Sequence, residues 1–390
     1  MHVTTPPLAA SQSYDIDSGI DVVFQLSGYI LGDSIRVHSN YSVAAAIPTR
    51  AQNAEQGTQQ ARFIAPEIGF HGVFASSTVR IDNQQIEYIA QYPQYASQVL
   101  MTTESSDKIQ MSPLAFMEHR GGHNNCVGSN ALVDSDGTHD IVGHKSFAVK
   151  PLCVLSHMPI IDAKTRYITL TLRLNNNKAF VVKQNGGSDI KIILDSLYIS
   201  YETVSDALGK KLLTDTKDLT YPIVSTQLLS IKSNQEYLSL NLPAVGNVIG
   251  WVATSVPVYD PTYGNYNQFR TMAIPNLTRM RLTLNGRDIN QTFPMVTYAP
   301  GNDQQLEIMK AHKVLQLAGL TQKATAFGTS DREFYYKLDG VYSDAYPPSG
   351  IAFDNSSTLG FEINSDVQNG VLYGAKQYQF YLSLISRATV

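Results

Sequence analysis

Apolar and polar residues alternate along short stretches of this chain, which is the pattern of half-buried β-strands. The clearest case is residues 168–174, where four aliphatic side chains alternate with Thr and Arg. A period of two places these aliphatic side chains on one face of a strand, so we expect that face to be buried. Residues 21–26 and 35–38 are short, rich in β-branched residues and bounded by Gly or Ser, and we predict strands there too.

Similar runs continue to the end of the chain. Residues 179–183 and 190–201 are predicted strands, and the Asn185-Gly186-Gly187 turn between them favours a hairpin because both turn positions tolerate positive φ. Strands are predicted in the second half at 221–229, 237–242, 248–258, 280–284, 333–338, 360–364 and 378–386. Many short strands with few helices indicate β-sandwiches or barrels.

One local plan occurs twice. Residues 79–86 predict a strand, a tight polar turn and the start of a second strand, and residues 282–289 repeat this arrangement 203 residues later. A predicted helix follows each copy, at residues 92–100 and at residues 304–318. A repeat period near half the chain length predicts two similar domains in tandem.

Changes in composition suggest where these domains begin and end. Residues 1–19 are polar, contain Pro and Ser, and show no periodicity, so we predict an extended N-terminal arm. Residues 205–220 concentrate Asp and Lys in a chain that otherwise has few charges, so we predict a linker there. The two domains are then expected at residues 20–204 and 221–390.

Composition restricts the function classes. Charged residues make up 16% of the chain, below the roughly 25% usual for soluble proteins, while Tyr (22) and Phe (14) are plentiful. Such a surface suits broad protein–protein contact.

The net charge of −4 argues against condensing nucleic acid, which needs a clustered basic surface. No Lys or Arg precedes Arg36, so the basic region of a secretory signal is lacking, and residues 245–258, the most apolar segment, are too short to span a bilayer.

The search for chemistry yields no strong motif. The sequence has no Gly-x-Ser-x-Gly elbow, no His-Glu-x-x-His, no Gly-x-x-x-x-Gly-Lys loop and no dinucleotide fingerprint. Residues 134–140 resemble a calcium loop, but they lack the third acidic position before Gly and the terminal Glu, so a β-turn is favoured. We therefore predict no catalytic, cofactor-binding or metal-binding residues.

The best metal candidates lie in and after a Gly- and Asn-rich stretch. They are His119, His123, Cys126, His139, His144, Cys153 and His157. Their spacing is looser than the short pairs that zinc sites use, and a surface loop is the favoured interpretation. Two cysteines cannot make a disulfide framework, and free thiols are favoured over a single bridge.

The order of these features resembles the double jelly-roll major capsid proteins, the lineage of adenovirus hexons, tailless membrane-containing phages, virophages and large eukaryotic DNA viruses. Residues 69–74, leading into the turn after residue 81, are similar to the middle strand and turn of the first jelly roll, which a short flanking helix follows. Residues 284–286 lead similarly to the second flanking helix, and residues 346–354 resemble the closing Tyr-Pro-x-Gly…Phe-Asp segment. The chain departs from the family pattern in two ways, which bear on its branch within the family. Residues 265–269 read Asn-Tyr-Asn-Gln-Phe where some branches have Asn-Pro-Phe, and the chain is short, without the tall loops of hexons.

The resemblance implies an all-β chain of two tandem eight-stranded jelly-roll β-sandwiches, each with a short flanking helix. It implies a structural, non-enzymatic protein of the virion, three copies of which form a pseudo-hexagonal capsomer of an icosahedral DNA virus. The expected partners are the chain itself, neighbouring capsomers, penton and minor capsid proteins and, where one is present, an internal membrane. No cofactor and no sequence-specific nucleic-acid binding are expected.

An alternative from another class stays open. A tandem-sandwich carbohydrate-binding protein could stack Tyr-rich loops on sugar rings. A glycan-processing enzyme could use paired acids such as Asp344 and Asp354, because glycosidases need only two carboxylates.

Overall fold

The computed structural model describes two compact units. The described residues are 2–5, 14–15, 19–44, 68–103, 117–118, 146–175, 191–231, 235–240, 246–257, 277–288, 313–314, 341–345, 350–352, 359–365 and 378–390. The first unit comprises those up to Ser97 and those between positions 104 and 219. The second comprises Gln98–Thr103 and the described residues from Thr220 onward.

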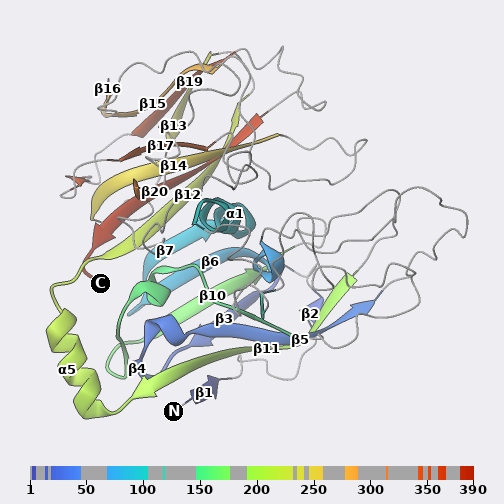
Figure 1. Ribbon diagram of the computed structural model, residues 1–390, viewed down its shortest axis with the longest axis vertical. Helices are drawn as coiled ribbons and strands as arrows, with labels where there is room; N and C mark the ends of the chain where they lie inside the picture. The colour runs from blue at the N-terminus through green and yellow to red at the C-terminus, as the bar shows by residue number, and fades with distance from the viewer. Residues whose placement is uncertain are drawn as a thin grey trace, which may run out of the picture. The chain divides into compact units, whose positions relative to one another are not determined.

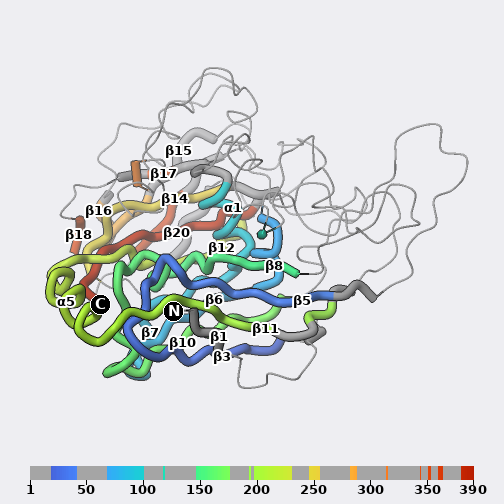
Figure 2. The backbone as a smooth tube through the Cα atoms, turned by 60° about the horizontal axis from the view of Figure 1, so that its bottom comes forward, coloured from blue at the N-terminus to red at the C-terminus, as the bar shows by residue number. Residues whose placement is uncertain are grey.

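The first unit is built from two antiparallel sheets. Its strands are β1 (His2–Thr5), β2 (Tyr14–Asp15), β3 (Asp21–Gln25), β4 (Gly28–Ile30), β5 (Arg36–Ala44), β6 (Phe74–Ile81), β7 (Gln84–Ala90), β8 (Ser146–Val149), β9 (Ile161–Ala163), β10 (Ile168–Leu174) and β11 (Lys191–Val204). One sheet has the order β8-β5-β11, and β1 and β2 also pair with β11. The other contains β7-β6-β10-β3, which lie side by side in Figure 1. Figure 2 shows β5 and β11 running together along the first sheet.

The strand order in these sheets is that of a jelly roll. Apart from the short strands β4 and β9, the strands can be numbered one to eight along the chain, with β1 and β2 as one interrupted strand. One sheet then holds strands one, eight, three and six, and the other holds two, seven, four and five. Such interleaving of the first and last strands in one sheet, with two Greek keys, defines the jelly roll.

The second unit repeats this order. Its strands are β12 (Tyr221–Ile231), β13 (Gln235–Leu240), β14 (Asn247–Pro257), β15 (Leu277–Leu284), β16 (Arg287–Asp288), β17 (Val341–Ala345), β18 (Ile351–Ala352), β19 (Leu359–Ser365) and β20 (Tyr378–Ala388). One sheet is β17-β14-β20-β12, with the short β18 paired to β14, and the other is β13-β19-β15-β16. Numbered in the same way, they hold strands one, eight, three, six and two, seven, four, five. The prediction of two tandem jelly rolls is confirmed.

The alternating pattern of residues 168–174 becomes β10 and faces the core of the first unit. Leu170 and Leu172 are buried, and Leu170 pairs with Val79 on β6 and with Phe24 on β3. Arg173, on the opposite face, is exposed. Each buried aliphatic side chain contributes about 1.5–3 kcal/mol relative to an exposed one, which explains why the alternation is kept so strictly.

One sheet of the second unit is buried on both faces. Consecutive residues of β20, from Phe380 to Ser386, are at most 2% exposed. In a sheet with one solvent-exposed face, buried and exposed side chains would alternate along the strand. The continuous buried run therefore shows that both faces of this sheet are shielded from solvent. Part of the cover within this unit is Gln98, whose Nε2 donates to the carbonyls of Val252 (3.0 Å) and Tyr381 (3.3 Å), while its Oε1 accepts from the Ser383 hydroxyl.

The hairpin that the sequence repeats has the same turn in both units. Asp82 (φ 51°) and Asn83 (φ 67°) connect β6 to β7, and Asn285 (φ 51°) and Gly286 (φ 74°) connect β15 to β16. Positive φ at both central residues defines a type I′ turn, whose twist matches that of the flanking strands. The repeated strand and turn predicted at residues 79–86 and 282–289 are therefore confirmed.

The predicted linker contains a helix that packs on the first unit. Helix α5 (Asp206–Thr216) is mostly exposed, which accounts for its charges, but Gly209 is buried. A Cβ on Gly209 would lie 2.3 Å from Cγ of Tyr29, so only glycine fits this approach. Asp206 also forms an ion pair with Lys164.

Helix α1 (Tyr92–Thr103) confirms the first predicted flanking helix. Of the second, residues 304–318, only Lys313 and Val314 are described, and both are helical. The strands predicted at 179–183 and 333–338, and the turn between 183 and 190, lie outside the described residues. Residues 1–19, predicted as an extended arm, include β1 and β2. The domain limits at residues 20, 205 and 221 stay predictions.

Candidate functional site

Residues 150–154 connect β8 to the 3₁₀ helix Val154–His157, and three of their backbone donors are bonded to side chains. The N–H groups of Lys150, Leu152 and Val154 donate to Glu118 Oε1 (3.1 Å), Tyr92 Oη (2.9 Å) and Glu87 Oε2 (2.8 Å) respectively. Three side chains thus accept hydrogen bonds from backbone that lies outside the assigned strands.

The three acceptors come from separate parts of the first unit. Glu87 lies on β7, Tyr92 begins α1, and Glu118 is a turn residue directly after the helical Met117. All are buried: Glu87 and Glu118 are 3% exposed and Tyr92 is 0% exposed. Burying a carboxylate is costly unless it is hydrogen-bonded, and bonds between a carboxylate and a backbone N–H are charge-assisted and short.

His71 connects two of these acceptors. Its Nδ1 lies 3.3 Å from Tyr92 Oη, and its Nε2 lies 3.3 Å from Glu118 Oε1, a contact too poorly directed to be a good hydrogen bond. Since Tyr92 Oη accepts from Leu152, its own proton is free to donate to Nδ1. The ring of His71 thus lies between the Tyr92 hydroxyl and the Glu118 carboxylate.

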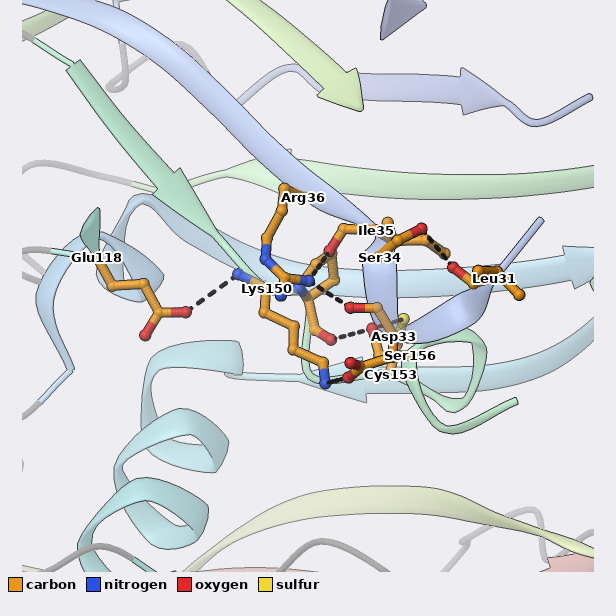
Figure 3. Close-up of polar contacts among 10 residues, drawn as sticks. Leu31, Asp33, Ser34, Ile35, Arg36, Glu118, Lys150, Cys153 and Ser156 are labelled. Atoms are coloured by element: carbon orange, nitrogen blue, oxygen red, sulfur yellow. Dashed lines mark hydrogen bonds and ion pairs between the residues drawn. The ribbon is translucent and has the colours of Figure 1, made fainter. Parts of the chain in front are cut away.

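A surface group of charges borders this cluster. Figure 3 shows Lys150 between Glu118, which its backbone N–H reaches, and Asp33, with which its side chain forms an ion pair. The bond from Lys150 lowers the pKa of Asp33. Asp33 is 85% exposed, so the pair contributes about 0–1 kcal/mol. Arg36 Nη1 donates to the carbonyls of Asp33 (2.6 Å) and Ile35 (2.8 Å). These bonds hold the backbone that leads from the 3₁₀ helix Gly32–Ser34 into β5.

Cys153 is a buried, free thiol. It is 2% exposed and free, and burial raises its pKa to about 12. Its sulfur lies 4.0 Å from Ser156 Oγ, and that hydroxyl donates to the Pro151 carbonyl (2.5 Å). Because the thiolate is the nucleophile, a thiol with so high a pKa is poorly suited to catalysis.

The metal candidates are not brought together where the structure describes them. Cys153 and His157 are the two candidates within the described residues, and His119, His123, Cys126, His139 and His144 lie outside them, as do residues 134–140. Across the described ranges, no three or more His, Cys, Asp or Glu side chains could hold a metal ion. Of the paired acids, Asp344 lies on β17 and Asp354 is outside the described residues.

Sequence reasoning missed the buried cluster altogether. His71 lies in the 3₁₀ helix Gly69–Val73, which the sequence analysis noted only for its resemblance to a family segment. Glu87 stands at an inward-facing position of β7, one residue beyond the strand start predicted at residues 79–86. Glu118 carries no pattern that sets it apart from exposed acids.

Several solved structures of viral capsids and capsid proteins are similar to this chain. A quasi-atomic model of the PBCV-1 virus capsid matches with a TM-score of 0.53 and 10% identity, covering 99% of this chain and 93% of that one. The structure of the Sputnik virophage gives 0.53 and 11%, covering 99% and 85%. The Faustovirus major capsid protein gives 0.50 and 8%, covering 100% and 89%.

These likenesses define the class of fold. The chain is similar over its whole length to double jelly-roll capsid structures, so the all-β prediction and the resemblance seen in the sequence are confirmed. No protein-family model and no curated protein matches the sequence. Neither described helix is long and apolar enough to cross a membrane.

Proposed function

We propose that this chain is a major capsid protein whose homotrimers form the pseudo-hexagonal capsomers of an icosahedral DNA virus shell. The observation that carries the proposal is the identical interleaved strand order in both units. Three chains with two similar domains each supply six similar domains, and head-to-tail contacts between unlike domains close a ring with cyclic symmetry. The few charged residues of the chain, 16%, suit broad interfaces, whose cores are depleted in Lys and Glu.

The partners and the location follow from this role. The chain would lie in the virion and contact itself, neighbouring capsomers, penton and minor capsid proteins and, where one exists, an internal membrane. A structural, non-enzymatic role is supported by the capsid proteins to which the fold is similar. A net charge of −4 supports a shell that does not itself condense the genome.

The mass of the purified protein in solution tests the proposal. Light scattering after size exclusion should give about 129 kDa, three times the 42.9 kDa of one chain. Electron micrographs of that species should then show a six-sided outline. A stable species of one chain mass at every concentration would overturn the proposal, and binding on a glycan array would favour the carbohydrate-binding alternative.

A further inference from the structure

The turn between β15 and β16 presents an Asn-Gly pair to solvent. Asn285 and Gly286 are its central residues, and Leu284 and Arg287 pair across it to close the hairpin. Asn285, Gly286 and Arg287 are all exposed. Among the described residues, no atom lies within 4 Å of the place that a Cβ on Gly286 would take. Asn285 is therefore followed by a residue that has no side chain and stands in an open position.

An Asn followed by Gly can react with its own backbone. The amide nitrogen of Gly286 attacks Cγ of Asn285, a five-membered succinimide ring forms, and the side-chain nitrogen leaves as ammonia with the proton of the Gly286 amide. Water then opens the ring at one of its two C–N bonds and leaves either aspartate or isoaspartate, whose main chain runs through Cβ and Cγ. One water is consumed and one ammonia is released, with no change of oxidation state.

The hairpin does not use the nitrogen that attacks in this step. In a two-residue turn the N–H of the fourth residue donates to the carbonyl of the first, so the N–H of Arg287, and not that of Gly286, closes this turn. Gly also populates a wide range of backbone dihedrals, so the Gly286 nitrogen can rotate towards Cγ of Asn285. The turn can therefore reach the ring-forming geometry without breaking the β15–β16 ladder.

Asn83, in the corresponding turn of the first unit, is placed differently. It is the second central residue, so the nitrogen that follows it belongs to Gln84, which pairs with Ile81 and closes the turn. Attack by that nitrogen would break the hydrogen bond of the turn itself. Gln84 also carries a side chain where Gly286 has none. We therefore expect Asn83 to stay intact where Asn285 reacts.

Asp82 has the place in the first turn that Asn285 has in the second, with the same φ of 51°. Its carboxylate accepts from Arg166 Nε (2.9 Å) and from Tyr167 N–H (2.9 Å), and the bond from Arg166 lowers its pKa. An ionised carboxylate is a poor target for an amide nitrogen, so Asp82 resists ring formation. Its presence also shows that this position of a type I′ turn accepts an aspartate.

We propose that Asn285 is a modification site, at which the second jelly roll deamidates spontaneously with water as the co-reactant. Each event adds one negative charge beside the exposed Arg287. Aspartate keeps the turn, as Asp82 does in the first unit. Isoaspartate adds an atom to the main chain between Leu284 and Arg287, and so disturbs the pairing of β16, which is only two residues long.

Peptide mapping of the folded full-length protein during incubation in mildly alkaline buffer tests the proposal. Trypsin releases Leu282–Arg287, in which Asn285 is the only side-chain amide. This peptide should gain about 1 Da, the change from amide to acid, and should separate into an aspartate and an isoaspartate form. A sample digested without incubation gives the starting value. Asn285→Gln should show no gain over the same period, because glutamine would have to form a larger ring.

The variant Gln84→Gly is the matched control, because it places the same Asn-Gly pair in the first turn and changes only its position. In the folded variant Asn83 should stay intact while Asn285 is converted, and in urea the two should react at similar rates. Conversion of Asn83 as fast as Asn285 in the folded variant would refute the role of the turn. An unchanged mass of Leu282–Arg287 in the folded protein would overturn the proposal itself. Neither result depends on the mass of the assembled protein, so the proposed function is tested separately.

Discussion

At the scale of single residues, Gln98 shows how a polar side chain can be structural. Its amide is 1% exposed and bonds two carbonyls and a hydroxyl of β14 and β20 within the second unit. We predict that Gln98→Met, which keeps the volume and removes the amide, lowers the free energy of unfolding by about 1–3 kcal/mol. Urea unfolding would measure this loss.

Gln379→Met is the control for that prediction. Gln379 also lies on β20, but it is partly exposed and makes only a 3.4 Å contact with Ser230 Oγ. Its replacement should change stability by no more than about 0.5 kcal/mol. Equal losses in the two variants would mean that the buried amide bonds contribute nothing specific.

His157 makes stability depend on pH. Burial is the main cause that lowers its pKa from 6.5 to about 4, and the nearby Lys150 adds to the effect. Between these two pH values His157 is protonated in the unfolded chain but not in the folded chain. The free energy of unfolding therefore falls as the pH drops from 6.5 towards 4. We predict that His157 lowers the free energy of unfolding by up to about 2 kcal/mol between pH 7.5 and pH 5. The melting temperature should fall over the same range.

The variant His157→Gln isolates that contribution. It cannot titrate, so its melting temperature should fall less over the same pH range, and other histidines cancel in the comparison. The bond from Lys150 lowers the pKa of Asp33 below its ordinary 3.8. Asp33 therefore stays ionised between pH 7.5 and pH 5, and its contribution to stability does not change over that range. Parallel pH profiles of the two proteins would contradict the prediction.

At the scale of elements, the two type I′ turns can be compared directly. Asn83 has φ 67° and Gly286, at the corresponding place in the second unit, has φ 74°. Asn83→Gly should therefore be neutral or slightly stabilising, whereas Asn83→Val should cost about 1–2 kcal/mol, because a β-branched residue is strained at positive φ. Thermal unfolding of the two variants checks both signs, and equal melting temperatures would rule out a backbone cause.

The elements that the sequence predicts well are those whose pattern is local. β10 alternates because one face is buried, and the turn residues Asn285 and Gly286 are what positive φ favours. Helix α5 was missed, because Gly209 is a poor helix former in mid-helix and is required only by the ring of Tyr29. That reason lies in tertiary contact, which a pattern along one element cannot contain.

At the scale of the whole molecule, the sequence predicts the repeated fold but not the buried cluster. The tandem arrangement is visible because strand, turn and helix recur in the same order after 203 residues. The acceptors Glu87, Tyr92 and Glu118 come from a strand, a helix and a turn, and their meeting with residues 150–154 depends on how the roll closes. Glu118 has no local pattern to mark it, so its role follows only from the folded chain.

The shared strand order allows the two halves of the chain to be compared with each other. If both halves descend from one ancestral roll copied within its gene, the chain holds two independent records of the same architecture. Features that survive in both, such as the paired positive-φ residues at Asp82–Asn83 and Asn285–Gly286, mark what the architecture itself demands. The chain therefore provides its own comparison, between two copies of the same turn in one sequence.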